Sequence, residues 1–209
     1  KDVKRGDAFE KFEDCREDID AQISFLKKQG FSKIYLAGHS LGAPKVVHYL
    51  SKTKDKRVKG LILLAPSDMH GLTKQNKKNY QRDLAEAKRL VKAGRGNELL
   101  SNYLDDFYPI SARSYLSLNV KPNSGVFSFH DPDYKFKQLN SIAVPMLTIF
   151  GKKDFAQVKK KKKVVEIISA NTKKSPRVDT KILGNAPHSF AGYEQKLAKE
   201  ISVWIKQNK

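Results

Sequence analysis

Residues 33–50 read KIYLAGHSLGAPKVVHYL, and this stretch divides into a strand, a tight turn and a helix. Its first five residues, 33–37, are rich in side chains that favour strands. In the second half, apolar side chains from Val46 to Leu50 recur at helical spacing. Pro44 suits that helix, because in a first turn its missing N–H has no intrahelical acceptor to lose. The stretch therefore predicts one strand–turn–helix unit of an α/β protein.

The flanking sequence continues this alternation of helices and strands. An apolar stripe at helical spacing precedes residue 33, and Gly30 is expected to end that helix. Later segments predict strands at Val58–Leu64, Ile142–Phe150 and Arg177–Leu183, a lysine-rich helix ending near Asn171, and a last helix carrying Tyr193, Leu197, Ile201, Trp204 and Ile205. This order predicts a mostly parallel sheet with right-handed crossovers and helices on both faces. Functional side chains are then expected at the carboxyl ends of the strands.

The region between the second and third strands contains no convincing buried strand. Helical patterns there span Tyr80–Val91, Glu98–Phe107 and Ser111–Leu118, separated by glycine and proline. We interpret residues 67–140 as a helical cap inserted into an α/β core made of residues 1–66 and 141–209. No linker rich in Gly, Ser or Pro divides the chain further, so one domain with an insertion is expected.

The turn Gly38-His39-Ser40-Leu41-Gly42 fits the pattern G-x-S-x-G, with the preceding strand and following helix that this pattern requires. Ser40 then lies in a strained turn, where the flanking glycines let the backbone and the helix approach without Cβ clashes. The helix amino terminus favours a developing oxyanion, so the Leu41 N–H is the expected oxyanion donor. His39 is expected to point away from the serine and to serve in packing. The turn therefore predicts Ser40 as a nucleophile.

A serine hydroxyl needs an imidazole to accept its proton and a carboxylate to orient that imidazole. Of the five histidines, only His188 follows a predicted strand through a short loop and precedes the last helix. Three other histidines outside the motif are expected to be surface or structural residues: His48, His70 and His130. Of these, His70 and His130 fall in the cap, and one of them can touch substrate. Asp154 is the expected acid, because a G-x-x-D turn after the third strand brings it near His188. Asp68 is the alternative acid, since it also follows a strand.

Together, Gly38-His39-Ser40-Leu41-Gly42, the segment Pro145–Asp154 and Pro187-His188-Ser189-Phe190 resemble the α/β-hydrolase superfamily along nearly the whole chain. The resemblance implies a serine hydrolase that cleaves the ester of a small or medium-sized molecule through an acyl-enzyme, with no metal or organic cofactor. Three cap segments are similar to a branch related to siderophore-ester and small-ester hydrolases: Ser67–Met69, Tyr108–Leu118 and Phe127–Tyr134.

One departure from the superfamily concerns the start of the chain. Members normally have several strands before the nucleophile strand, and an early loop that supplies a second oxyanion donor. Neither is found before residue 33. We therefore expect the sequence to be part of a longer protein. We also expect these residues alone to hydrolyse esters poorly, because loss of one oxyanion donor costs roughly 10²–10³ in rate.

The composition limits the other classes of partner. The formal net charge is +19, yet the 33 lysines far outnumber the eight arginines and are dispersed. Specific nucleic-acid binding is therefore not expected, because it favours clustered arginine forks among aromatic side chains. The lysine run at 159–163 is interpreted as a solvated helix face.

No run of residues approaches the ~20 apolar residues that span a bilayer. A single cysteine, Cys15, favours a cytoplasmic location and is expected to be buried and without a catalytic role.

Three alternatives remain open at this stage. An amidase, a peptidase or a thioesterase can use the same three residues. A non-catalytic α/β-hydrolase-like binding protein has the same fold. A polyanion-binding protein would use the positive charge, and dispersed lysines argue against it. The oligomeric state and the identity of the substrate do not follow from the sequence.

Overall fold

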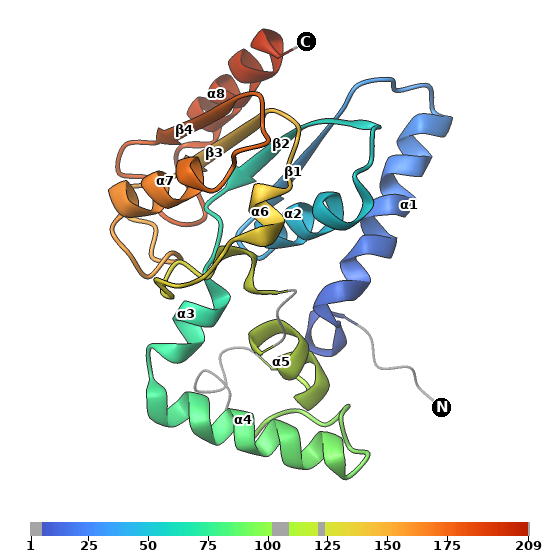
Figure 1. Cartoon of the computed structure of the whole chain (residues 1–209), viewed down its shortest axis with the longest axis vertical. Coiled ribbons are helices and arrows are strands. Elements are labelled where there is room, and N and C mark those ends of the chain that lie inside the picture. The colour runs from blue at the N-terminus through green and yellow to red at the C-terminus, as the bar shows by residue number, and fades with distance from the viewer. Residues whose placement is uncertain (1–5, 102–108, 121–123, 209) are drawn as a thin grey trace.

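The computed structural model describes residues 6–101, 109–120 and 124–208 (Figure 1). Its centre is a sheet of four parallel strands in the order β1-β2-β3-β4, which span Ile34–His39, Val58–Leu64, Met146–Phe150 and Val178–Ile182. All four lie within or next to predicted strands. The predicted α/β fold with a parallel sheet is therefore confirmed, and no strand precedes β1 in residues 6–33.

Helices cover both faces of the sheet, as predicted. Helix α2 (Gly42–Thr53) connects β1 to β2, α7 (Lys161–Ala170) connects β3 to β4, and α8 (Glu194–Gln207) follows β4. Side chains of a strand alternate between the faces. Leu61 and Leu63 of β2 accordingly pack in the larger hydrophobic cluster with α2 and α7, while Ile62 packs with Trp204 of α8. Successive crossovers of one hand place their helices on one face, and the last helix closes the other.

The chain reaches the sheet through a helix that ends as predicted. Two short 3₁₀ turns, η1 (Asp7–Phe9) and η2 (Phe12–Asp14), precede α1 (Cys15–Lys28). Gly30 follows α1 with a φ of 88°, a left-handed conformation that glycine adopts without strain. The α-helix begins later than the apolar stripe indicates, because Phe12 donates its N–H to Ser117 Oγ at 2.8 Å rather than to the preceding turn.

Helices of the predicted cap region extend from the sheet to one end of the molecule (Figure 1). They are α3 (Met69–Lys74), α4 (Lys77–Lys92), α5 (Ala112–Asn119), η4 (Gly125–Phe127) and α6 (Lys137–Asn140). Helix α4 begins at a capping residue, Asn76, whose Oδ1 accepts the Asn79 N–H at 3.1 Å, and Ser111 caps α5 in the same way. These two helices match the predicted segments 80–91 and 111–118. Because α6 packs on α2 and the main hydrophobic cluster is continuous, the cap boundaries at 67 and 140 stay a prediction.

Two predicted elements differ from the structure. The helix predicted at 98–107 is wrong where it is described, because Leu99 forms an antiparallel bridge with Ser111, whereas residues 102–107 lie outside the described segments. The strand predicted from Ile142 begins only at Met146. Pro145 has no N–H to donate to the sheet, and Ile142 instead closes a turn on Leu139 O at 3.2 Å.

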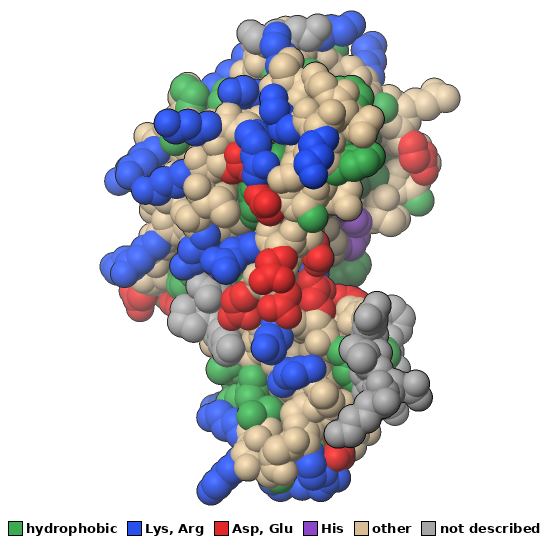
Figure 2. All heavy atoms as spheres, turned by 90° about the vertical axis from the view of Figure 1, so that its right-hand side faces the viewer, with side chains coloured by type: hydrophobic (Ala, Val, Ile, Leu, Met, Phe, Trp, Pro, Cys, Tyr) green, Lys and Arg blue, Asp and Glu red, His purple; other side chains and the backbone are tan. Residues whose placement is uncertain are grey.

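The distribution of charged side chains and the burial of Cys15 agree with the predictions from the sequence. Lys and Arg side chains are spread over the face shown in Figure 2, and Asp and Glu gather near its middle. Within the described segments, no helix has the length and apolarity needed to cross a bilayer. Cys15 is 3 % exposed, and burial raises the pKa of its thiol to about 12. The predicted burial of Cys15 is thus confirmed.

Candidate active site

Ser40 lies in the turn between β1 and α2, at the carboxyl end of its strand. Its φ is 52°, in the left-handed region that few residues other than glycine adopt. Two backbone bonds hold this conformation: the Ser40 N–H donates to Leu64 O at 2.9 Å, and the Ser40 carbonyl accepts from Ala43 N–H at 3.2 Å. The turn therefore presents the half-buried Ser40 hydroxyl at the end of the sheet.

The two glycines of the motif differ in what they allow. A Cβ at Gly38 would lie 2.3 Å from the Gly42 carbonyl oxygen, so only glycine fits there. At Gly42, a Cβ would meet no atom within 4 Å. The expectation that both glycines prevent a steric clash is therefore confirmed for Gly38 and wrong for Gly42. The steric constraint therefore applies at Gly38, near the end of β1, and not at Gly42, in the first turn of α2.

His188 reaches Ser40 from the loop between β4 and α8. Its Nε2 lies 2.8 Å from Ser40 Oγ. His39 contacts this loop: its Nε2 lies 2.8 Å from the His188 carbonyl oxygen, and its ring lies 5.1 Å from that of His188. The ring of Phe155, a side chain that is 67 % exposed, lies 5.0 Å from the His188 ring. His39 thus bonds to the backbone of the histidine loop, in keeping with the packing role expected of it.

Asp154 completes a chain of hydrogen bonds from the turn after β3. Its Oδ1 lies 2.7 Å from His188 Nδ1 and 3.0 Å from the Ala156 N–H, and its Oδ2 accepts from Gln157 Nε2 at 2.5 Å. Burial favours the neutral acid, but the bonds from His188, Ala156 and Gln157 outweigh it and lower the pKa of Asp154 below its usual value. The carboxylate is therefore ionised at neutral pH, and it orients His188 with the proton on Nδ1.

Asp68, the alternative acid, bonds to a different histidine. Its side chain is fully buried and accepts the Gly71 N–H at 2.7 Å and the His130 N–H at 2.8 Å. The His130 ring places Nδ1 3.0 Å from Asp68 Oδ2. Asp68 therefore joins α3 to the segment around His130, and the structure does not bring it to His188.

Leu41 follows Ser40 and is the residue directly before α2. Within the described part of the chain, its N–H donates to no protein acceptor. An amide at a helix amino terminus that lacks a partner can bind an anion. The placement is compatible with the predicted oxyanion role, which stays a prediction.

His48 and His70 are buried and form hydrogen bonds away from Ser40. His48 lies 2.9 Å from Gln138 Oε1 through its Nδ1, and His70 lies 3.1 Å from Ser124 Oγ through its Nε2. Burial lowers the pKa of both, that of His70 to about 4. Within the described residues, no group of three or more His, Cys, Asp or Glu side chains has an arrangement that could hold a metal ion.

Several residues of the site carry no signal in the sequence. Gln157 bonds to Asp154 and also donates to Pro66 O at 3.1 Å, so one amide connects the ends of β2 and β3. Lys161 donates to the Asp154 carbonyl oxygen from the start of α7. Gln157 and Lys161 are close to Asp154 in sequence, but no motif marks them, and only the bond from Gln157 to Pro66 joins distant segments. His130 lies in the predicted cap, and nothing in its local sequence indicates Asp68 as its partner.

Several solved structures have a similar fold. Monoacylglycerol lipase from Paleococcus ferrophilus is 18 % identical, with a TM-score of 0.62 over 96 % of this chain and 77 % of the lipase. For monoglyceride lipase from Saccharomyces cerevisiae the identity is 16 % and the TM-score 0.64, over 95 % of this chain and 69 % of the other. Est1E from Butyrivibrio proteoclasticus, also 16 % identical, gives a TM-score of 0.55 over 92 % and 69 % of the two chains. At identities this low, the structural similarity establishes the fold alone.

No curated protein sequence is significantly similar to the chain. Residues 10–206, nearly the whole chain, match the sequence model of the family described as "Protein of unknown function (DUF1749)". The chain therefore belongs to the DUF1749 family and has the α/β-hydrolase fold.

Proposed function

We propose that this chain is a serine hydrolase that cleaves a carboxylic ester of a small or medium-sized molecule through an acyl-enzyme. The observation that carries the proposal is the continuous chain of hydrogen bonds from Ser40 Oγ through both ring nitrogens of His188 to Asp154 Oδ1, at 2.8 and 2.7 Å. Esterase and lipase names among the proteins of similar fold favour an ester over an amide.

The geometry supports a two-step mechanism. His188 Nε2 takes the hydroxyl proton as Ser40 Oγ bonds to the ester carbonyl carbon, and Asp154 stabilises the imidazolium that forms. The carbonyl oxygen becomes an oxyanion, to which the Leu41 N–H donates. When the C–O bond breaks, the alcohol leaves with the proton from His188. Water then gives a proton to His188 as its oxygen bonds to the acyl carbon. When the bond from that carbon to Ser40 Oγ breaks, His188 returns the proton to Oγ and the acid is released.

Phe155 and the cap supply the proposed substrate-binding surface. Phe155 is an exposed aromatic side chain beside His188, in the position where an apolar group of the substrate can contact it. We further propose that residues 67–140 act as the cap that sets specificity, since this segment follows the carboxyl end of β2 next to Ser40. The contact between the Ser67 N–H and the Ser40 carbonyl oxygen, at 3.4 Å, supports that position.

The experiment is fluorophosphonate labelling of the wild-type protein beside Ser40→Ala, with Ser67→Ala as the matched control. Ser67 is a buried neighbouring serine whose hydroxyl has no hydrogen-bond partner among the described residues. We expect wild type and Ser67→Ala to be labelled and Ser40→Ala to stay unlabelled. Labelling that persists in Ser40→Ala would exclude Ser40 as the nucleophile. A panel of matched esters, thioesters and amides then tests the substrate class, and turnover of amides alone would contradict the ester.

A further inference from the structure

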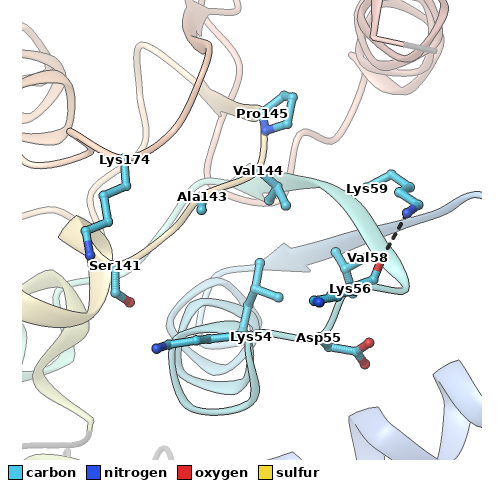
Figure 3. Close-up of a pocket in the computed structure, with 11 residues that line it drawn as sticks. Lys54, Asp55, Lys56, Val58, Lys59, Ser141, Ala143, Val144, Pro145 and Lys174 are labelled. Carbon is cyan, nitrogen blue, oxygen red and sulfur yellow. Dashed lines mark hydrogen bonds between the residues drawn. The ribbon is translucent and has the colours of Figure 1, made fainter.

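A cavity of about 540 Å³ lies at the amino ends of the strands of the sheet (Figure 3). It is formed where α2 leads into β2 and where the chain enters β3 and β4, so its walls come from the amino ends of parallel strands. Ser40, Asp154 and His188 lie beyond the carboxyl ends of the same strands. The cavity is therefore separate from the candidate active site, and its volume falls within the range of small-molecule sites.

The inner wall of this cavity is apolar. Leu50 and Val58, 5 % and 1 % exposed, belong to the main hydrophobic cluster, and Val144 packs against that cluster. Val144 and Pro145 form the upper wall in Figure 3. A ligand in the cavity would cover apolar surface at the end of the protein core, which favours an apolar body.

The rim of the cavity carries four lysines, Lys54, Lys56, Lys59 and Lys174. In Figure 3, Lys54 and Lys174 extend on one side and Lys59 lies on the opposite side. None of the four forms an ion pair with a carboxylate of the described residues. Lys59 Nζ donates to Lys56 O at 2.9 Å, and none of the four positive charges has a counterion in the part of the chain that the structure describes.

The one acidic residue at the rim is already neutralised by another partner. Asp55 accepts from Tyr49 Oη at 2.5 Å and from Arg57 through Nε at 2.9 Å and Nη2 at 2.7 Å. Its carboxylate points away from Lys54 and Lys174 (Figure 3). The cavity thus combines an apolar wall with four lysines that form no ion pair within the described residues.

We propose that this cavity binds a small organic anion, in which one carboxylate, sulfonate or phosphate group is joined to an apolar body. The apolar part lies against Leu50, Val58 and Val144, and the anionic group meets the lysines at the rim. Lysine suits this task because its ammonium group is a compact point charge that accepts several anion geometries. The site lies outside the hydrolase machinery, and the proposal does not depend on the function of Ser40.

Isothermal titration calorimetry with decanoate tests the proposal, with decanol and inorganic phosphate as the two half-ligands. We expect saturable one-to-one binding of decanoate that weakens as salt is raised, because salt screens exposed charges. Each half-ligand should bind at least about tenfold more weakly, since it lacks either the charged or the apolar contact. Equal binding of decanol, equal binding of phosphate, or no saturable binding of decanoate would overturn the proposal.

Variants locate the binding site. The pair Lys54→Gln and Lys174→Gln should weaken decanoate binding by roughly tenfold, because two charged contacts are removed. The matched pair Lys88→Gln and Lys92→Gln removes the same charge from exposed positions of α4 and should bind like the wild type. Ala143→Phe fills the cavity from an exposed position without changing the charge and should abolish binding. Wild-type affinity in the Lys54/Lys174 variant would place decanoate elsewhere, including at Ser40, and would refute this site.

Discussion

Gly151 lies so close to Ala186 that a Cβ on Gly151 would stand 2.1 Å from the Ala186 carbonyl oxygen. Next to it, the Lys153 N–H donates to the same oxygen at 3.1 Å. These contacts join the turn that carries Asp154 to the loop that carries His188. The 2.7 Å separation of Asp154 Oδ1 and His188 Nδ1 therefore depends on the absence of a side chain at residue 151.

Replacing Gly151 by alanine should separate the acid from the base. The new Cβ must push the two loops apart, and such a shift typically costs about 1–3 kcal/mol of unfolding free energy. We also expect ester turnover to fall at least tenfold, because a displacement of ~1 Å at a catalytic group is costly. Urea unfolding and kcat/KM measure the two effects. Wild-type values of both in Gly151→Ala would contradict the geometry.

The pair Gly38→Ala and Gly42→Ala tests the turn around Ser40. Gly38→Ala should lower the unfolding free energy by about 1–3 kcal/mol, because its Cβ meets the backbone of Gly42. Gly42→Ala should be neutral or stabilise the fold by up to about 1 kcal/mol, since the position is helical and open. Thermal and urea unfolding of both variants decide this. Similar losses in the two variants would contradict the asymmetry.

Asp154→Asn and Asp68→Asn distinguish the two candidate acids. Asn at 154 cannot hold His188 in the tautomer that accepts the serine proton, so kcat should fall by about 10⁴ while the fold persists. Asn at 68 leaves His188 untouched but weakens the bonds to Gly71 and His130. It should lower the unfolding free energy by about 1–3 kcal/mol and keep kcat within tenfold. The reverse pattern would make Asp68 the acid.

His70 should make the fold less stable in mild acid. Burial, with repulsion from Lys74, lowers its pKa from 6.5 to about 4. Between these values the unfolded chain binds a proton that the folded chain does not, so stability falls as the pH falls through this window. The total loss is about 3 kcal/mol.

His70→Asn removes this titration and is the matched comparison. Its unfolding free energy, measured from pH 7 to pH 4, should decline less steeply than that of the wild type, by up to one bound proton. Parallel curves for the two proteins would show that His70 does not cause the difference. The result holds even where Asn lowers stability at every pH, because only the slope is compared.

The sequence alone predicted the fold and the placement of Ser40, Asp154 and His188 at the carboxyl ends of its strands, and it left Asp68 open as an alternative acid. Period-two and period-3.6 patterns are local, so all four strands and the helices that cover them were predicted from their own residues. Ser40, Asp154 and His188 each follow a strand, and parallel strands place their carboxyl ends at one edge. The helix predicted at Glu98 failed where it is described, because Leu99 pairs with Ser111, twelve residues further along.

Tertiary structure decided which partner each polar side chain takes. Asp68 and Asp154 occupy equivalent places in the pattern, yet Asp68 bonds to His130 and Asp154 to His188. The bond from Gln157 to Pro66 O, the Gly151 contact and the lysine-rimmed cavity are also products of three-dimensional packing. The physical reason is range: backbone periodicity is set within a few residues, whereas hydrogen bonds and charge clusters form between segments whose separation only the folded chain determines.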